Sequence, residues 1–599
     1  MRYKKVVTDL LVIGGSGAGV MASVYASKSD VKVTLVSKGK VGFSGNAIMA
    51  GGGFGIDGQS ASELGIKDAD ESFTRDRMFD CIVKESFYLS DQDMVEQYVK
   101  EGPIAVNKLL EWKDASKQKF LFFKPANWIM SGLSIGKSLR YGLKQHPEVE
   151  VFEDVIIFEL IKDKEKVCGA LGIDIINGEF IFFESKATII GTGGYQPFSE
   201  NNTVTDMTGD GQAMALRAGA SLSDMEFILA FPTAVYPEHM KGSIYPFIFE
   251  YNMRDLKYDI IDKNGEVVNI PEDVIRVSRG GKLSKLITTY YFGKCKDENL
   301  LGSHDGWFYD YSQNSVETID KSFETLYNRF DNWHKHGYYK GESLAEVEKI
   351  IYDKKPLEVG MGFEYCMGGI EVNDKMETSV EGLYAAGEVT SGVFGACRVG
   401  DGIVEMLAQG MRAGLSAYEY IKNINRLEVE DELIEKSIDK VMKYLDDEDG
   451  MNAIQIYKSI EKACDEGFSY LRDEEGMGKA LNTINCLIDQ QKSIRTKEKS
   501  LIYNVELINA ISSENLLQCV KASIISGLER KESRGCHIRK DFPEVDFDNY
   551  TVKNVVSLDE NNNFIITKRK PRVTKIDLKQ GKSESVVEYF MDPSLNYRR

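Results

Sequence analysis

Short apolar runs alternate with helical stretches over the first part of the chain. The run from Asp9 to Ile13 is of strand type, a helix is expected from about Ala18 to Ser27, and Val31 to Val36 predicts a second strand. A further apolar strand is expected at Ala187–Ile190. Strands that alternate with helices are typical of parallel sheets, so residues 1–232 are expected to form an α/β domain.

The remaining chain divides by pattern into four segments. Residues 233–344 form an aromatic-rich insertion with a hairpin-type turn at 262–265, and residues 345–428 resume the alternation of strands and helices. Residues 429–545 have the apolar spacing of helices, as in 429–446 and 501–530. Residues 546–599 predict short strands.

A glycine-rich segment lies directly after the first predicted strand. Glycines at such a turn let the backbone approach a pyrophosphate, and the following helix directs its N-terminal N–H groups at the anion. Ser16 replaces the second glycine of the usual dinucleotide pattern, and Ser37-Lys38 stands where a ribose-binding acid is common. A strand–turn–helix without a ligand is the alternative, because a lone glycine motif is weak evidence. The expected dinucleotide-binding residues here are Gly14, Gly15, Ser16, Gly17, Ala18, Gly19, Ser37 and Lys38.

A second glycine-rich segment lies more than 350 residues later. It comprises Gly382–Glu388 and, shortly after, Gly395–Arg398. It repeats the order of strand, Ala-Gly, acid and glycine-rich turn before a helix. A cofactor that is long enough to be held at both ends would explain two such segments, and FAD is such a cofactor. The late segment is then expected to hold the isoalloxazine end.

Five sequence blocks occur in a fixed order between residues 9 and 543. They are the first glycine loop; Ser44 to Gly52; Thr208–Gly211 with Asp224–Thr233; Met367–Gly369 with Glu388 and Arg398; and Arg530 to Pro543. In this order they resemble the flavoprotein subunits of succinate dehydrogenase and fumarate reductase, to which L-aspartate oxidase and the adenylylsulfate reductase flavoprotein are related. The resemblance implies an FAD-binding Rossmann-like domain, an inserted α+β capping domain at 233–344, a C-terminal helical domain at 429–545 and a small β-rich domain at 546–599.

The resemblance also implies which residues bind FAD. Position 45 carries a histidine covalently linked to FAD in complex-type members, but it is Gly45 here. Glycine offers no nucleophile, so FAD is expected to bind without a covalent bond. Besides the first glycine loop, the implied cofactor residues are Ser44, Gly45, Asn46, Gly51, Gly52, Val155, Gly193, Asp210, Glu388, Arg398, Ile403 and Val404.

The chemistry that the resemblance implies is hydride transfer between flavin N5 and a carbon next to an activating group. Arg398 matches the arginine that clamps a substrate carboxylate, a role that suits the two parallel donors of a guanidinium. Arg279 is the favoured proton donor and Arg276 the alternative, although Gly280 replaces the aspartate that normally follows. Glu364 is expected either to act as a proton donor or base with a raised pKa, or to pair with Arg398 or Arg279.

Several positions depart from the family where it binds a four-carbon dicarboxylate. Leu229 replaces a glutamine, Cys397 replaces an asparagine, and Phe231, Glu364 and Phe394 replace histidines. Phenyl rings cannot hydrogen-bond a carboxylate, and an ionised Glu364 would repel one. The sequence therefore predicts reduction of an activated C=C bond, or the reverse reaction, in a substrate other than fumarate. This substrate is expected to have one carboxylate or carbonyl and an apolar or aromatic remainder. The alternatives are an adenylylsulfate-reductase-like flavoprotein and a protein whose FAD only relays electrons within a larger redox complex.

Composition excludes some partners and locations. The net charge of −19 argues against nucleic acid as a partner. No apolar stretch is long enough to predict a transmembrane helix. The chain runs almost directly into its first strand, which leaves no room for a signal peptide, so a cytoplasmic location is expected.

The cysteines and histidines predict neither a cluster nor a metal site in this chain. The nine cysteines form no C-x-x-C pair, and His334 with His336 alone would make a poor metal site. Most cysteines are expected to be reduced and buried, with Cys366 and Cys397 set apart because they fall in flavin-proximal blocks. Since no second dinucleotide site is found, a separate iron–sulfur or other electron-carrying subunit is predicted. An aspartate-oxidase-like enzyme that passes electrons to small acceptors is the alternative.

Overall fold

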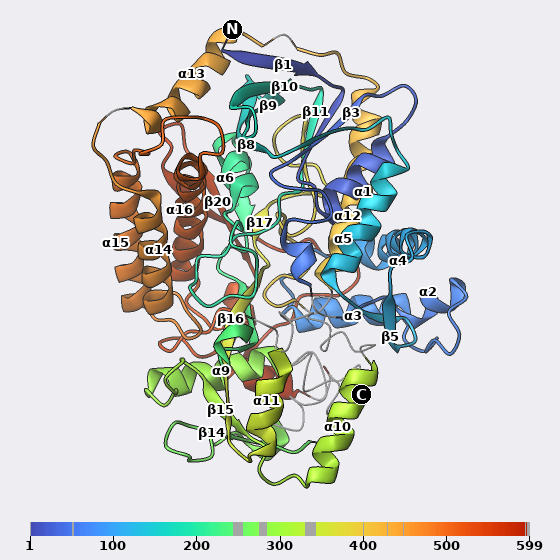
Figure 1. Ribbon diagram of the computed structural model, residues 1–599, viewed down its shortest axis with the longest axis vertical. Coiled ribbons are helices and arrows are strands. Elements are labelled where there is room, and N and C mark those ends of the chain that lie inside the picture. The colour runs from blue at the N-terminus through green and yellow to red at the C-terminus, as the bar shows by residue number, and fades with distance from the viewer. Residues whose placement is uncertain are drawn as a thin grey trace.

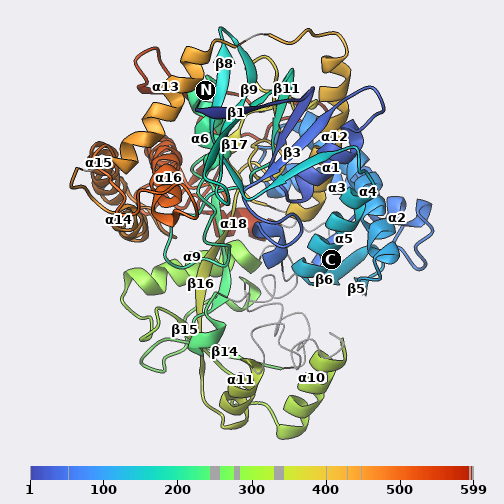
Figure 2. The same cartoon turned by 45° about the horizontal axis from the view of Figure 1, so that its top comes forward.

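The computed structural model describes residues 2–50, 53–242, 256–274, 284–329, 343–398, 401–427, 429–446, 448–592 and 595. The domain with both glycine-rich segments forms the upper part of Figure 1, and the inserted segment lies below it. The C-terminal helices stack along one side, an arrangement also visible in the tilted view of Figure 2.

A five-stranded parallel sheet forms the centre of the upper domain, which confirms the predicted α/β fold. Its strand order is β18-β11-β2-β3-β7. The late strand β18 pairs in parallel with β11, with Leu383 opposite Thr188. Two segments that are far apart in the sequence thus lie in one sheet. The strands are β2 (Leu10–Ile13), β3 (Val33–Ser37), β7 (Glu150–Glu153), β11 (Ala187–Ile190) and β18 (Leu383–Ala385).

Helices and smaller sheets surround this centre. The helix α12 (Gly402–Ile421), which follows the late glycine-rich segment, packs against α1 (Gly17–Ala26), which follows the early one. The other helices are α2 (Gly58–Glu63), α3 (Arg75–Glu85), α4 (Gln92–Ala115), α5 (Gly132–Lys144) and α6 (Asp210–Arg217). One sheet has the order β1-β10-β9-β8 and another β4-β6-β5. Their strands are β1 (Tyr3–Val7), β8 (Val155–Asp163), β9 (Lys166–Asp174), β10 (Glu179–Glu184), β4 (Gly53–Gly55), β5 (Phe120–Lys124) and β6 (Asn127–Met130).

Two long antiparallel strands lead into and out of the inserted segment. They are β13 (Ile228–Ala234) and β16 (Leu357–Cys366), and the sheet continues through β15 to β14. The predicted boundary at 232 therefore falls inside β13, and the one at 345 falls inside α11. The other elements of this segment are β14 (Asp259–Ile261), β15 (Trp307–Asp310), α9 (Ser284–Asp297), α10 (Val316–Arg329) and α11 (Ser343–Tyr352).

The C-terminal helices pack against the sheet domain through the longest of them. Helix α16 contacts both α6 and β20. The helices are α13 (Asp431–Met442), α14 (Ala453–Gly467), α15 (Glu474–Gln491) and α16 (Val505–Glu529). Two strands of the tail, β20 (Lys553–Leu558) and β21 (Phe564–Arg569), join two short strands of the sheet domain, β12 (Leu222–Ser223) and β17 (Gly369–Ile370). The order in this sheet is β17-β12-β20-β21. The last helix in the described ranges is α18 (Val586–Met591).

A buried aspartate fixes the tail to the sheet domain. Asp91, at the start of α4, is 1% exposed and receives two hydrogen bonds from Arg569, at 2.8 and 2.7 Å. Lys553 Nζ lies 3.1 Å from Asp91 Oδ2 and 2.7 Å from Asp224 Oδ2. Burial alone would raise the pKa of Asp91, but Lys553 and Arg569 outweigh it and hold the pKa well below its usual range.

The sequence block from Arg530 to Pro543 is buried at Arg530 and from Glu532 to Arg539, whereas Lys531, Lys540, Asp541 and Pro543 are exposed. Arg530 donates to Glu226 at 2.7 Å and to Glu532 at 2.9 Å, and Arg534 donates to Glu532 at 2.6 Å. These side chains have no solvent exposure. The block therefore joins the helical domain to the sheet domain, and its buried side chains are not available to a partner.

Candidate active site

The loop between β2 and α1 forms one end of a cavity of about 850 Å³. Gly14 has a φ of +116°, and a Cβ there would lie 2.2 Å from the carbonyl oxygen of Gly191. A Cβ on Gly19 would lie 1.8 Å from the carbonyl oxygen of Gly14. Both positions therefore require glycine. The first turn of α1 carries no acidic residue, so its N–H groups and positive dipole end are available to an anion.

An ion pair occupies the place where a ribose-binding acid is common. Lys38 follows β3, and its Nζ lies 3.2 Å from Oδ2 of Asp210, the first residue of α6. Asp210 also accepts a hydrogen bond from Asn515 of α16 at 2.8 Å. Both Lys38 and Asp210 line the cavity beside Ser37.

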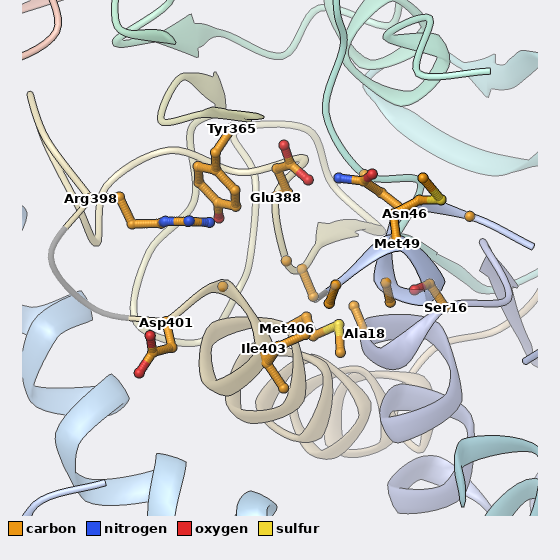
Figure 3. A pocket seen from close by; sticks show the side chains of 18 of the residues that line it. Ser16, Ala18, Asn46, Met49, Tyr365, Glu388, Arg398, Asp401, Ile403 and Met406 are labelled. Carbon is orange, nitrogen blue, oxygen red and sulfur yellow. The ribbon is translucent and has the colours of Figure 1, made fainter. Parts of the chain in front are cut away.

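The opposite end of the cavity is formed by the late glycine-rich segment and the start of α12. Figure 3 shows Glu388 between Tyr365 and Asn46, with Ile403 and Met406 below them. Burial raises the pKa of Glu388 to about 7, although a hydrogen bond from the backbone N–H of Cys366 at 3.3 Å opposes this shift. The two glycine-rich segments therefore bound one continuous cavity.

Buried polar atoms with no partner show that this cavity fits a polar ligand. Thr192 Oγ1 and both amide atoms of Asn202 are buried, and none has a hydrogen-bond partner among the described residues. Thr192 and Asn202 both line the cavity. Burying polar atoms without hydrogen bonds is costly, so a ligand is expected to supply them. The residues present thus fit a cofactor with polar groups along its length, as FAD has.

Most of the predicted cofactor residues line this cavity. They are Gly14, Gly15, Ser16, Ala18, Ser37, Lys38, Ser44, Gly45, Asn46, Val155, Gly193, Asp210, Glu388, Arg398 and Ile403. Gly17, Gly19 and Val404 do not line it; they are buried in the packing of α1 and α12. Gly51, Gly52, Arg276 and Arg279 lie outside the described residues.

Three charged side chains meet at the end of the cavity that the late glycine-rich segment forms, which is called the flavin end below. Arg398 Nη2 lies 2.9 Å from Glu364 Oε1, and Lys285 Nζ lies 3.2 Å from Glu364 Oε2. All three line the cavity and are less than 20% exposed. Lys285, from α9 of the inserted segment, is absent from the predicted site. Its only signal in the sequence is its position six residues after Arg279.

The structure decides between the two expectations for Glu364. Burial alone would raise the pKa of its carboxyl, but the charges of Arg398 and Lys285 outweigh it, and the pKa is lowered. The expectation of a raised pKa is therefore wrong, and Glu364 is the ion-pair partner of Arg398. Burial lowers the pKa of Lys285, although the charge of Glu364 opposes this.

Only some of the substituted family positions face the cavity. Phe231 does, and Lys285 Nζ lies 4.0 Å from the centre of its ring. Leu229 and Phe394 are buried, and Phe394 packs edge-on beneath Tyr365, with 6.1 Å between the ring centres. Phe394 thus shapes the site through Tyr365 rather than by touching a ligand in the cavity.

Sequence reasoning missed Tyr365, which lines the cavity, and Glu405, which contacts Tyr365 from behind the cavity wall. The guanidinium of Arg398 lies 4.3 Å from the centre of the Tyr365 ring (Figure 3). The Tyr365 hydroxyl donates a hydrogen bond to Glu405 on α12, and burial raises the pKa of Glu405 to about 8. Neither residue belongs to a motif that would have indicated it.

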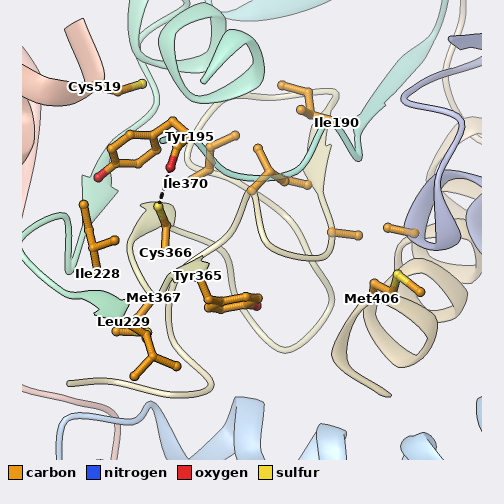
Figure 4. Close-up of a cluster of buried hydrophobic side chains, with 14 of the residues drawn as sticks. Ile190, Tyr195, Ile228, Leu229, Tyr365, Cys366, Met367, Ile370, Met406 and Cys519 are labelled. Carbon is orange, nitrogen blue, oxygen red and sulfur yellow. Dashed lines mark hydrogen bonds between the residues drawn. The ribbon is translucent and has the colours of Figure 1, made fainter. Parts of the chain in front are cut away.

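The cysteines of the flavin-proximal blocks are buried in the interior. Cys366 donates from its thiol to the carbonyl oxygen of Tyr195 at 2.9 Å, as Figure 4 shows. Burial raises the pKa of this thiol well above its usual value, so it is not a reactive thiolate. Cys397 is 5% exposed and does not line the cavity. Among the described residues no group of histidines, cysteines or acids could hold a metal ion.

The family is settled by comparison with protein-family models. Residues 9–403 match the model described as an FAD binding domain, and residues 457–584 match the one described as the fumarate reductase flavoprotein C-term. The chain belongs to the fumarate reductase and succinate dehydrogenase flavoprotein family. It binds FAD and is an FAD-dependent oxidoreductase. No helix in the described ranges is long and apolar enough to cross a membrane.

Individual relatives match over almost their whole length. The chain is 27% identical over 559 residues to a fumarate reductase (CoM/CoB) subunit of Methanothermobacter marburgensis, covering 90% of this chain and 94% of that protein. Its fold is similar to that of quinol fumarate reductase FrdA of E. coli, with a TM-score of 0.81, 22% identity and coverage of 96% and 99%. Adenylylsulfate reductase of Archaeoglobus fulgidus gives a TM-score of 0.77 at 19% identity, covering 96% and 97%.

Proposed function

We propose that this protein reduces an activated carbon–carbon double bond, or oxidises the corresponding single bond, in a substrate other than fumarate. The substrate has one carboxylate or carbonyl group and an apolar or aromatic remainder. The observation that carries this proposal is the ion pair between Arg398 and Glu364 at the flavin end of the cavity. Bound FAD supplies the hydride chemistry; the residues of this chain orient the substrate.

Arg398 has the donors to hold the activating group. Its guanidinium is fixed by Glu364 and by the face of the Tyr365 ring, so it stays in one orientation. Such a preorganised cation stabilises negative charge that develops on a carbonyl or carboxylate oxygen. Phe231 offers an apolar surface for the rest of the substrate. Arg279 stays the predicted proton donor and Arg276 the alternative.

Fumarate is expected to fit this site poorly. In the family, histidines stand where this chain has Phe231 and Glu364, and the carboxylate of Glu364 repels a second substrate carboxylate. The loss of a charged or strongly polar contact costs about 2–4 kcal/mol in such sites. Two such changes are expected to leave only slow turnover of fumarate.

An anaerobic dye-linked reductase assay with a panel of enoates tests this function. We expect turnover of an enoate with one carboxylate or carbonyl and an apolar chain, and little with fumarate. Fumarate turnover at roughly 1–1000 per second would refute the proposed substrate. Strict dependence on adenylylsulfate would instead support a sulfur-reducing flavoprotein. No substrate reduction, with rapid electron exchange between dyes, would support an electron relay.

We also propose that a separate iron–sulfur or other electron-carrying subunit docks on this chain. One relative is described as a fumarate reductase subunit, and another as the FrdA protein of a quinol fumarate reductase. The interior position of Arg530, Arg534 and Glu532 means that the partner would contact other surfaces of the helical domain. Native purification from the source cell tests this. Co-purifying iron and labile sulfide would support it, whereas a lone flavoprotein that reacts rapidly with oxygen would refute it.

A further inference from the structure

The carboxylate of Glu364 is held between two cations from different parts of the chain. Lys285 comes from the start of α9, Glu364 from β16, and Arg398 from the segment after β18. We propose that Glu364 and Lys285 set the charge selectivity of the substrate site, with Glu364 acting as a built-in carboxylate that excludes a second carboxylate of the substrate. This proposal rests on the proposed function, because it concerns the same site.

Both oxygens of Glu364 are already used. Oε1 accepts from Arg398 at 2.9 Å and Oε2 faces Lys285 at 3.2 Å. Each cation therefore has part of its charge neutralised before a ligand enters. Lys285 also lies over the Phe231 ring at 4.0 Å, which places its ammonium beside the apolar wall of the cavity. A substrate group between Phe231 and Arg398 would thus lie close to both cations and to Glu364.

Among the described residues around Glu364, two positive side chains are matched by two acidic ones. Arg398 and Lys285 are positive, and Glu364 and Asp401 are acidic. The lowered pKa of Glu364 keeps it ionised at neutral pH. The remaining carboxyls nearby, Glu388 and Glu405, have raised pKa values of about 7 and 8 and add negative charge as they ionise. A dianion therefore finds no surplus of positive charge among these residues, whereas a monoanion or a neutral carbonyl compound needs none.

Removing the negative charge of Glu364 should have a measurable effect on the binding of a charged ligand nearby. Two unit charges about 5 Å apart interact by about 1–3 kcal/mol when the effective dielectric constant is between that of a protein surface and that of water. This corresponds to roughly a tenfold to hundredfold change in affinity for each negative charge of the ligand. Glu364→Gln keeps the shape of the side chain and removes only the charge, so it isolates this term.

Fumarate and its two methyl esters form a matched series of ligands. Fumarate, monomethyl fumarate and dimethyl fumarate share one double bond and carry two, one and no negative charges. Binding to the oxidised holoenzyme is measured by the change in visible flavin absorption during titration, with isothermal calorimetry as a second readout. Because this measures binding, the charge series can be determined even if no enoate is turned over, a result that would count against the proposed function alone.

We expect Glu364→Gln to raise the affinity for fumarate at least tenfold relative to dimethyl fumarate, with monomethyl fumarate in between. Lys285→Met is expected to change the series in the opposite direction, and it also tests the proposal if Glu364→Gln does not fold. Glu200→Gln is the control, because it removes a carboxylate paired with Lys241 at 2.7 Å outside the cavity, and it should leave the series unchanged. An equal change for all three ligands in Glu364→Gln would overturn the proposal, as would a Lys285→Met enzyme with the wild-type series.

Discussion

The substitution Asp91→Asn should release the C-terminal tail from the sheet domain. Asp91 is the common acceptor of Arg569 and Lys553, and it is almost completely buried. An amide in its place removes the carboxylate that both cations share, so that Lys553 keeps only Asp224 and Arg569 keeps only Glu371. Breaking a buried ion pair by removing one partner costs about 3–5 kcal/mol.

Hydrogen exchange of the tail strands is the appropriate assay, since a chain of several domains does not unfold in one step. A loss of about 3–5 kcal/mol corresponds to amide exchange in β20 and β21 that is faster by about 100-fold or more. Exchange in the central strands β2 and β11 should change much less. Asp93→Asn is the matched control: Asp93 pairs with Arg572 at 2.6 Å, but its side chain is 24% exposed, so it should cost less than about 1 kcal/mol.

The pH dependence of this effect has a definite sign. The folded pKa of Asp91 is lowered, so its contribution is fully present above the pKa of an unfolded aspartate, about 3.9, and is lost only as the pH falls through the lower folded value. Between about pH 5 and 8 Asp91 should therefore stay ionised, and any change of tail protection in this window should come from Asp224, which shares Lys553 and whose pKa is raised by burial to about 6. Equal tail exchange in Asp91→Asn and Asp93→Asn would refute the reasoning.

Three further predictions concern the cofactor and the site. Acid precipitation of the purified protein should release all yellow flavin into the supernatant, because Gly45 has no nucleophile; flavin retained by the denatured chain would contradict this. Gly19→Ala should abolish FAD retention, read as the loss of absorbance near 450 nm relative to 280 nm, since its Cβ would lie 1.8 Å from the Gly14 carbonyl oxygen; a fully yellow variant would show that the loop can adjust. Arg398→Ala should lower kcat/KM for the true substrate by about 100-fold or more while the flavin stays bound; near-normal activity would remove Arg398 from the site.

Most of the residues that the sequence predicted for the cofactor line the cavity. Glycine at Gly19 is dictated by a backbone contact within one strand–turn–helix unit, glycine at Gly14 by its positive φ and the neighbouring strand end at Gly191, and Glu388 follows a strand of the same sheet. Such local constraints leave a sequence motif. The α/β core could be predicted for the same reason, since the apolar strands and the helices between them have different periodicities.

The substrate half could not be completed from the sequence. Lys285, Glu364 and Arg398 come from three separate elements, and their meeting depends on how α9 packs on β13, the strand that pairs with β16. The pKa of Glu364 illustrates the difficulty, because burial and ion pairing shift it in opposite directions, and only the structure shows that Lys285 supplies the second cation. Likewise, nothing in the spacing of the Arg530–Pro543 block distinguishes a buried junction from a docking surface.

The position of β18 in the central sheet also bears on how the protein is made. This strand completes the edge beside β11, yet it is synthesised about 370 residues after β2. At translation rates of about 5–20 residues per second, the interval between the two strands is roughly 20–70 s. During that interval the nascent chain has its phosphate loop but neither Glu388 nor α12, so it cannot enclose the whole cofactor. FAD incorporation is therefore expected late in biosynthesis, and the edge of β11 must be kept from other chains until nearly two thirds of the polypeptide has been made.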